Sequence, residues 1–199
     1  VRILEKNKFI SGKLEKLPPE GILYPETYFF LRNENINNIL KRMELKMTEK
    51  LNKVWKKKYD YLKSKNDLLI MASLIEAEAK DKNDKYLVSS VFHNRLKKNI
   101  RLQSDPTILY KKNLNKVNKD LKIYKKDLKS DNPWNTYTRK GLPVSPICNP
   151  GNEAIQAAAN PYISDYLYFV SDGQGRHKYS TNFKDHNINV KAWKKKNEQ

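Results

Sequence analysis

The stretch Leu68-Leu-Ile-Met-Ala-Ser-Leu-Ile75, followed at once by Glu76-Ala-Glu78, decides how this chain folds. It lies within a helical pattern over residues 67–80 and is apolar on all sides. A helix of that kind must be buried on most of its surface. With 199 residues, of which 38% are hydrophobic, the chain can build one sizeable core. We therefore expect this helix at the centre of a single domain.

Helices are also predicted on both sides of this stretch. Apolar residues recur at steps of three and four over residues 34–62 and 83–98, which is typical of amphipathic helices. A short alanine-rich helix is expected over residues 152–160, capped by Asn152. A last helix is expected over residues 183–196.

The remaining segments predict strands and loops. Aromatic and branched residues over 166–170 and 178–181 flank a glycine-rich turn, so a hairpin is expected there. Residues 21–30 contain Pro25 and predict an edge strand or an extended hook. Residues 132–151 are dense in Pro and Gly and predict a long irregular loop, whereas residues 111–129 predict a poorly ordered excursion. Together these features predict an α+β fold: a helical core, a small β-hairpin region and long irregular loops.

The composition limits the class of protein. The net charge is +18, which favours anionic surroundings, but the basic residues are mostly Lys and are scattered along the chain. A solvated lysine-rich surface is therefore preferred over a nucleic-acid footprint. No apolar run approaches the 20 residues of a membrane span, so the chain itself is expected to be soluble. It begins at Val1 rather than Met, which predicts that an N-terminal piece is missing.

Glu76 is the first candidate for chemistry. It ends the most buried helix on the face of Leu69, Ala72 and Ser73, whereas Glu78 lies about 200° further round at 100° per residue. The two carboxylates are therefore not expected to serve one cleft. Among apolar neighbours the pKa of Glu76 would rise, as a general acid requires. The alternative is that Glu76 pairs with a lysine at the helix end.

Other polar clusters have simpler explanations. Asp105 is placed to cap a helix that begins at Pro106. Asn135 and Tyr137 lie beside Trp134, a mixture that suits sugar rings but also a loop packed into the core. The three histidines lack the spacing of a metal site, so hydrogen bonding is their expected role. Cys148 is the only cysteine and cannot form an internal disulfide.

Eight segments, in order, resemble the endolytic murein transglycosylases, the YceG-like or MltG family. They run from about Glu20 to His186: Glu20-Gly-Ile-Leu-Tyr-Pro-Glu-Thr-Tyr28, Ala72-Ser-Leu-Ile-Glu-Ala-Glu-Ala79, Val91-Phe-His-Asn-Arg-Leu96, Leu102-Gln-Ser-Asp-Pro-Thr107, Asn135-Thr-Tyr137, Gly141-Leu-Pro143, Asn149-Pro-Gly151 and Tyr166-Leu-Tyr-Phe-Val170. The sequence departs from the family pattern at Glu26, where Asp is common, and at Lys111, where Gly is usual.

The resemblance implies a lytic transglycosylase without a cofactor or metal. Such enzymes cleave the β-1,4 bond between N-acetylmuramic acid and N-acetylglucosamine without water, and the muramyl 6-hydroxyl closes on C1 to leave a 1,6-anhydro end. It implies that Glu76 is the acid and base, and that nascent glycan strands are terminated or shortened. Substrate binding or support of the acid is assigned to Ser73, Gln103, Asp105, Asn135 and Tyr137.

The resemblance also implies a setting. Similar proteins carry an N-terminal membrane helix and a LysM-like module, which places the catalytic region on the outer face of the cytoplasmic membrane. Residues 1–19 would be a linker or the end of such a module, and residues 20–199 the transglycosylase domain. Peptidoglycan strands and peptidoglycan synthases (penicillin-binding proteins) are the implied partners.

Three alternatives stay open at the level of the sequence. A peptidoglycan-binding module without turnover would keep the aromatic loop but not need the acid. A nucleic-acid-binding protein would show binding that weakens steeply with salt. Related sequences have also been labelled aminodeoxychorismate lyases, which would need a lysine that binds pyridoxal phosphate and a phosphate cradle. No glycine-rich cradle is visible in this chain.

Overall fold

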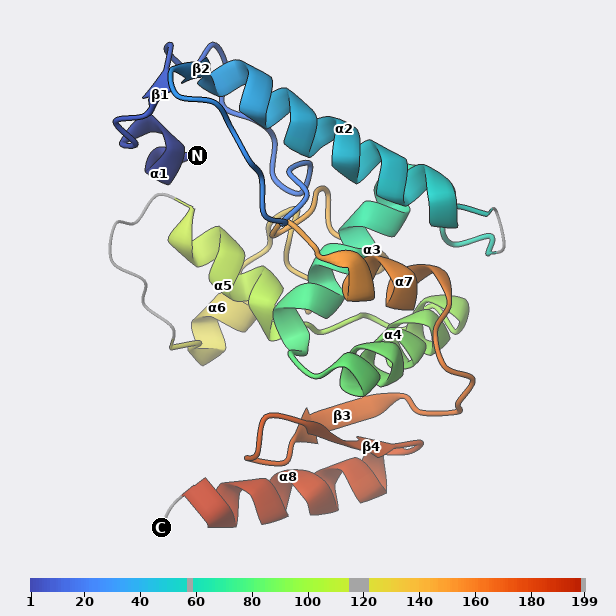
Figure 1. Ribbon diagram of the computed structural model, residues 1–199. Coiled ribbons are helices and arrows are strands. Elements are labelled where there is room, and N and C mark those ends of the chain that lie inside the picture. The colour runs from blue at the N-terminus through green and yellow to red at the C-terminus, as the bar shows by residue number, and fades with distance from the viewer. Residues whose placement is uncertain (57–58, 115–121, 198–199) are drawn as a thin grey trace.

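The chain folds as a helical core with one β-hairpin below it, as the computed structural model in Figure 1 shows. The structure describes residues 1–56, 59–114 and 122–197. The predicted α+β class is confirmed, since helices dominate and each described sheet has two strands. No described helix is long and apolar enough to cross a membrane.

Helix α3 (Lys65–Glu78) forms the centre of the core. It begins with a capping box, in which the Ser64 hydroxyl accepts the Asp67 N–H and the Asp67 carboxylate accepts the Ser64 N–H. Every residue from Leu68 to Ile75 is buried. The helix packs against α4 (Lys82–Lys97), α7 (Asn152–Ala159), α2 (Ile36–Val54) and α5 (Asp105–Asn113). The apolar stretch therefore forms the buried central helix that the sequence predicts.

Helix α2 ends earlier than the sequence pattern predicts. It stops at Val54, and residues 55 and 59–62 leave the helical path. Trp55, Tyr59, Tyr61 and Leu62 fold back onto the main core, where Leu62 is buried. A straight continuation at 1.5 Å per residue would have carried Leu62 about 12 Å past Val54. Burial of these side chains explains the early end.

The other predicted helices are confirmed to within a residue or two. Helix α4 begins after Asp81, whose carboxylate accepts the Asp84 N–H. Helix α7 is capped by Gly151 rather than Asn152, which is its first residue and makes no capping bond. Helix α8 (Phe183–Asn197) follows the hairpin. The expected excursion over 111–129 falls partly outside the described residues and otherwise contains the end of α5 and the short helix α6 (Lys125–Lys129).

The predicted hairpin consists of β3 (Tyr168–Ser171) and β4 (His177–Ser180), which pair antiparallel with Tyr168 opposite Ser180 and Ser171 opposite His177. Helix α8 covers this hairpin, and β3 contacts α4. In Figure 1 the hairpin lies between α4 and α8. Strands β3 and β4 and helix α8 thus form a layer beside the helical core.

The segment 21–30 adopts the extended hook rather than a strand. The Tyr24 N–H donates to the carbonyl of Met43 at 3.2 Å, and the Tyr24 ring is buried. Gly21 has a φ of +91°, and a Cβ there would lie 2.5 Å from the Cβ of Pro146. Glycine is needed here because the hook passes so close to the 132–151 loop. That loop is irregular, as predicted.

The N-terminal segment packs at the start of α2. Helix α1 (Arg2–Glu5) and strand β1 (Ile10–Ser11) precede β2 (Glu34–Asn35), which pairs parallel with β1. Their apolar side chains form a second small cluster around Leu23, Ile36 and Leu40. This cluster is separate from the core that surrounds α3.

Candidate active site

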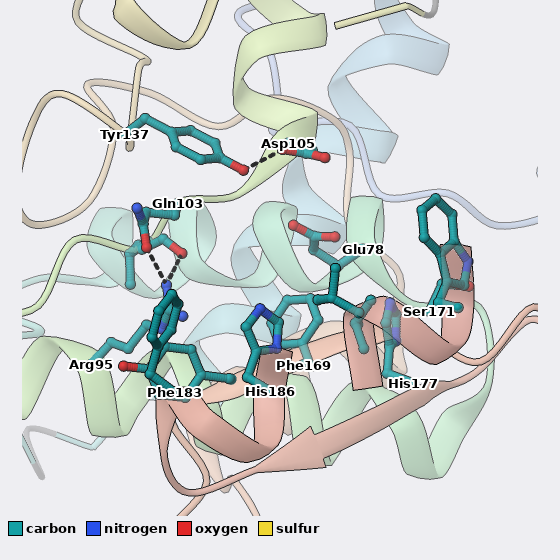
Figure 2. A pocket seen from close by; sticks show the side chains of 15 residues that line it. Glu78, Arg95, Gln103, Asp105, Tyr137, Phe169, Ser171, His177, Phe183 and His186 are labelled. Carbon is teal, nitrogen blue, oxygen red and sulfur yellow. Dashed lines mark hydrogen bonds between the residues drawn. The ribbon is translucent and has the colours of Figure 1, made fainter. Parts of the chain in front are cut away.

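A cavity of about 520 Å³ opens between the C-terminal end of α3 and the layer formed by β3, β4 and α8 (Figure 2). Its upper wall carries acidic and polar groups from α3, α5 and the loop at Tyr137, and its lower wall is largely aromatic. The lining residues are Glu78, Arg95, Leu102, Gln103, Asp105, Tyr137, Tyr168, Phe169, Val170, Ser171, His177, Phe183, His186, Val190 and Trp193.

Glu78 is the last residue of α3 and carries its carboxyl group into this cavity. The pKa of Glu78 is raised to about 7, mainly by burial and in part by the nearby Asp105 carboxylate. The Ser104 hydroxyl, which donates to Glu78 Oε1 at 2.6 Å, lowers it, as do His177 and Arg95. A carboxyl group with this pKa is protonated to a large extent near neutral pH, as a general acid requires.

Asp105 lies at the start of α5 and faces the same cavity. The predicted capping role is wrong, because Ser104 is the N-cap residue and Asp105 already belongs to the helix. The Asp105 carboxylate instead accepts the hydroxyl of Tyr137, as the dashed line in Figure 2 shows. Burial and this bond to Asp105 raise the pKa of Tyr137, so its hydroxyl stays a donor. The cavity therefore holds a second carboxylate beside Glu78.

Gln103 and Arg95 shape the near end of the cavity. Gln103 has a φ of +51°, an uncommon conformation for a residue other than glycine. Its Oε1 accepts from Nη1 of Arg95 at 3.3 Å, and the same Nη1 donates to the carbonyl of Leu102 at 2.9 Å. Nε of Arg95 donates to the carbonyl of Leu167 at 2.6 Å. This buried guanidinium thus links the residue just before β3 to the loop just before α5.

A cluster of Asp84, His177 and Tyr179 lies at the other end. His177 Nδ1 is 2.7 Å from Oδ2 of Asp84, whose Oδ1 accepts the Tyr179 hydroxyl at 2.6 Å. Burial raises the pKa of Asp84, but the hydrogen bonds from His177 and Tyr179 outweigh it and hold that pKa below its usual value. The carboxylate is therefore a permanent partner for the imidazole. The expectation that this histidine is hydrogen-bonded is confirmed.

The lower wall consists of one stripe of α8 and the strand above it. Phe183, His186, Val190 and Trp193 recur at helical spacing, so they share one face and line the cavity. The His186 ring stacks on Tyr168 with centroids 5.1 Å apart. We call these four residues and Tyr168 the aromatic wall. The cavity thus has an aromatic wall opposite its polar wall.

Three of the five predicted substrate-contact residues meet in the cavity, and two do not. Gln103, Asp105 and Tyr137 line it. Ser73 is fully buried: its hydroxyl donates to the carbonyl of Ile70 and accepts the Ile147 N–H. Asn135 is 1% exposed, and its amide group donates to backbone carbonyls between residues 127 and 130 while its oxygen accepts the Tyr137 N–H. Both side chains hold the loops in place.

Glu76 lies outside this cavity. Both of its oxygens are 2.9 Å from Nζ of Lys85, and Oε2 also accepts the Gly151 N–H at 3.1 Å. The expectation of apolar neighbours around this carboxylate is therefore wrong, and the alternative of a lysine pair is confirmed, although that lysine comes from α4. The helical phase argument holds, since the carboxylates of Glu76 and Glu78 have different partners.

Glu78 is thus the carboxyl group of this cavity that reasoning from the sequence did not select. Helical spacing does not separate it from Glu76, because the residues three, four and seven positions before each glutamate are all buried. Among the described residues, no three His, Cys, Asp or Glu side chains gather as metal ligands would.

Comparisons with known proteins agree on one family. A sequence model described as the YceG-like family matches residues 2–192. An endolytic murein transglycosylase of Bacillus subtilis is 41% identical over 180 residues, which cover 89% of this chain and 49% of that protein. One of Streptococcus pneumoniae is 35% identical over 179 residues, which cover 86% of this chain and 31% of that protein.

A solved structure gives the same result for the fold. A crystal structure of a yceG-like protein from Listeria monocytogenes superposes with a TM-score of 0.70 at 38% identity, over 84% of this chain and 53% of that one. The chain therefore spans about half the length of the Bacillus and Listeria relatives and less of the Streptococcus one.

Proposed function

Because this chain belongs to the YceG-like family, we propose that it is the catalytic part of an endolytic murein transglycosylase that acts through Glu78. The observation that carries the proposal is the position of Glu78, whose pKa is raised to about 7, in a cavity of about 520 Å³ with one polar and one aromatic wall. The relatives' names indicate the glycan of murein as the substrate.

In the proposed reaction Glu78 is the general acid. Its proton passes to the oxygen that links C1 of N-acetylmuramic acid to N-acetylglucosamine, and the C1–O bond breaks. The muramyl 6-hydroxyl closes on C1, so the product carries a 1,6-anhydro end. This closure releases the proton of the 6-hydroxyl, which the Glu78 carboxylate or another base in the cavity accepts. No water molecule is consumed.

Contacts to the sugar rings are proposed for both walls. Gln103, Asp105 and Tyr137 offer amide, carboxylate and hydroxyl groups on the side of the acid. Phe183, which is 62% exposed although it lines the cavity, offers an apolar ring on the other side. A sugar between the walls would pack one face on rings and direct its hydroxyl groups to polar side chains.

The pair of carboxylates supports one other reaction. Glycosidases that use water need two carboxyl groups, one as acid and one as base or nucleophile. Glu78 and Asp105 share the cavity, so hydrolysis is the second candidate. The two reactions leave different ends: anhydromuramyl ends from transglycosylation and reducing ends from hydrolysis.

Mass spectrometry of the products from purified sacculi tests this proposal. The native chain should release anhydromuramyl ends, and Glu78→Gln should lose about 10²- to 10⁴-fold in rate, which is typical for a positioned acid. The matched control is Glu76→Gln, two residues away on the same helix, which should keep its activity while folded. The reverse result would assign the acid to Glu76, and reducing ends would assign hydrolysis.

The setting of the whole protein is proposed from the family resemblance. The resemblance favours a membrane anchor before residue 1, action outside the cytoplasmic membrane on nascent strands, and peptidoglycan synthases as partners. The small cluster formed by residues 1–14 with α2 is compatible with the end of a LysM-like module over residues 1–19. Co-purification of the full-length protein with synthases tests the partners.

A further inference from the structure

The cluster of Asp84, His177 and Tyr179 has a geometry that the proposed acid does not need. Asp84 is buried near the start of α4, with 4% of its side chain exposed. Besides Tyr179 and His177 Nδ1, it accepts the backbone N–H of His177 at 3.2 Å. Three donors thus surround one buried carboxylate.

This arrangement fixes the orientation of the imidazole. Asp84 binds Nδ1, so the neutral ring carries its proton there and keeps a lone pair on Nε2. The ring also packs edge-on against Phe169, with centroids 4.9 Å apart. Among the described residues, no group forms a hydrogen bond with Nε2. His177 and Glu78 both line the cavity, and the charge of His177 acts on the Glu78 carboxyl group.

Resting on the proposed function, we propose that His177 is a second catalytic residue, the base that accepts the proton of the muramyl 6-hydroxyl, and that Asp84 is its positioning residue. A carboxylate that orients an imidazole, which in turn activates a hydroxyl group, is a recurrent arrangement for making an alcohol nucleophilic. Here the hydroxyl group belongs to the substrate rather than to the protein.

The step balances between the two residues. The bond from O6 to C1 forms as the bond from C1 to the leaving oxygen breaks. The O6 proton moves to Nε2 of His177, and the Glu78 proton moves to the leaving oxygen. The cavity then holds an imidazolium and a carboxylate, and one proton returns from His177 to Glu78 through solvent when the product leaves. The overall charge of the pair does not change.

Two groups explain the chemistry better than one. A single carboxyl group must give its proton to the leaving oxygen before it can accept the proton of the 6-hydroxyl. With one group, the two proton transfers therefore occur one after the other. With a separate base, both proton transfers can occur in one step. The charged imidazolium also stabilises the carboxylate that forms beside it, because His177 lowers the pKa of Glu78.

The test compares rates and products on purified sacculi for four variants of the chain. His177→Gln should lose about 10²- to 10⁴-fold in the formation of anhydromuramyl ends, and its residual products should contain a larger share of reducing ends. Asp84→Asn should form anhydromuramyl ends at least tenfold more slowly, because an amide no longer fixes the tautomer of His177. Asp84→Glu should recover part of that rate. Arg176→Ala, which removes an exposed ion pair with Asp81 beside His177, should match the native chain.

A native rate and product ratio in folded His177→Gln would overturn the assignment. If that variant does not fold, as judged by its thermal transition, the contrast between Asp84→Asn and Asp84→Glu decides, and equal activity of these two would also overturn it. Failure of the proposed function looks different: the native chain would then form no anhydromuramyl ends, or Glu78→Gln would remain active.

Discussion

Replacing Glu78 by Gln is expected to remove activity and, at alkaline pH, to stabilise the folded chain. Burial raises the pKa of this carboxyl group from its ordinary value of 4.5 to about 7. The folded chain therefore holds the proton in a range where the unfolded chain has released it. Stability contributed by the proton is complete below pH 4.5 and is lost as the pH rises through 7.

The size of the effect follows from the same pKa values. Each unit of pKa corresponds to about 1.4 kcal/mol, so a rise from 4.5 to about 7 costs the folded state roughly 3 kcal/mol once Glu78 is ionised. A glutamine has the same shape and never ionises. We therefore expect Glu78→Gln to be more stable than the native chain by about 2–3 kcal/mol at pH 8 and by little at pH 4.5.

Urea unfolding at these two pH values measures the difference directly. Glu76→Gln is the matched control, and it should change the free energy of unfolding in the opposite direction. It leaves the ammonium group of Lys85, whose side chain is only 10% exposed, without its carboxylate. That variant should be destabilised by about 1–3 kcal/mol at pH 8. Equal stability of Glu78→Gln and the native chain at both pH values would refute the claim that Glu78 is desolvated.

Three further predictions concern the cavity and its supports. Asp105→Asn removes a charge that raises the pKa of Glu78, so the loss of activity on the alkaline side should begin at lower pH than in the native chain, as a profile of rate against pH would show. Phe183→Ala should weaken binding of glycan fragments to Glu78→Gln about 3- to 10-fold in calorimetry without lowering thermal stability, because the ring is largely exposed; unchanged affinity would remove it from the sugar site. Gly21→Ala should lower the free energy of unfolding by at least about 1 kcal/mol, because its Cβ would meet Pro146 at a positive φ, and a native urea midpoint would contradict this.

Helix positions were predictable where the burial pattern and the cap are local. The stretch around Leu74 is apolar on all sides, so only a central helix can accommodate it. The end of α2 was not predictable, because Trp55 and Leu62 reach apolar surroundings equally well along a helix or along a chain that turns back. Only the packed core distinguishes the two paths.

The site was also predictable only where it depends on local pattern rather than on tertiary contacts. Helical phase separates Glu76 from Glu78, but which of them is paired with a lysine depends on where Lys85 of α4 lies, and that is a tertiary contact. Ser73 and Asn135 show a second limit. Hydroxyl and amide groups that suit a sugar also suit buried carbonyl groups, so residue type alone does not separate contact with substrate from support of a loop.

The aromatic wall has a consequence for how the protein is made. Glu78 lies on a helix from the first half of the chain, whereas α8 follows only after the hairpin. Since chains emerge from the ribosome N-terminus first, α3 can pack with α2 and α4 while the cavity still lacks its lower wall. The cavity between Glu78 and α8 is therefore complete only after the hairpin and α8 have been synthesised and have packed beside α4.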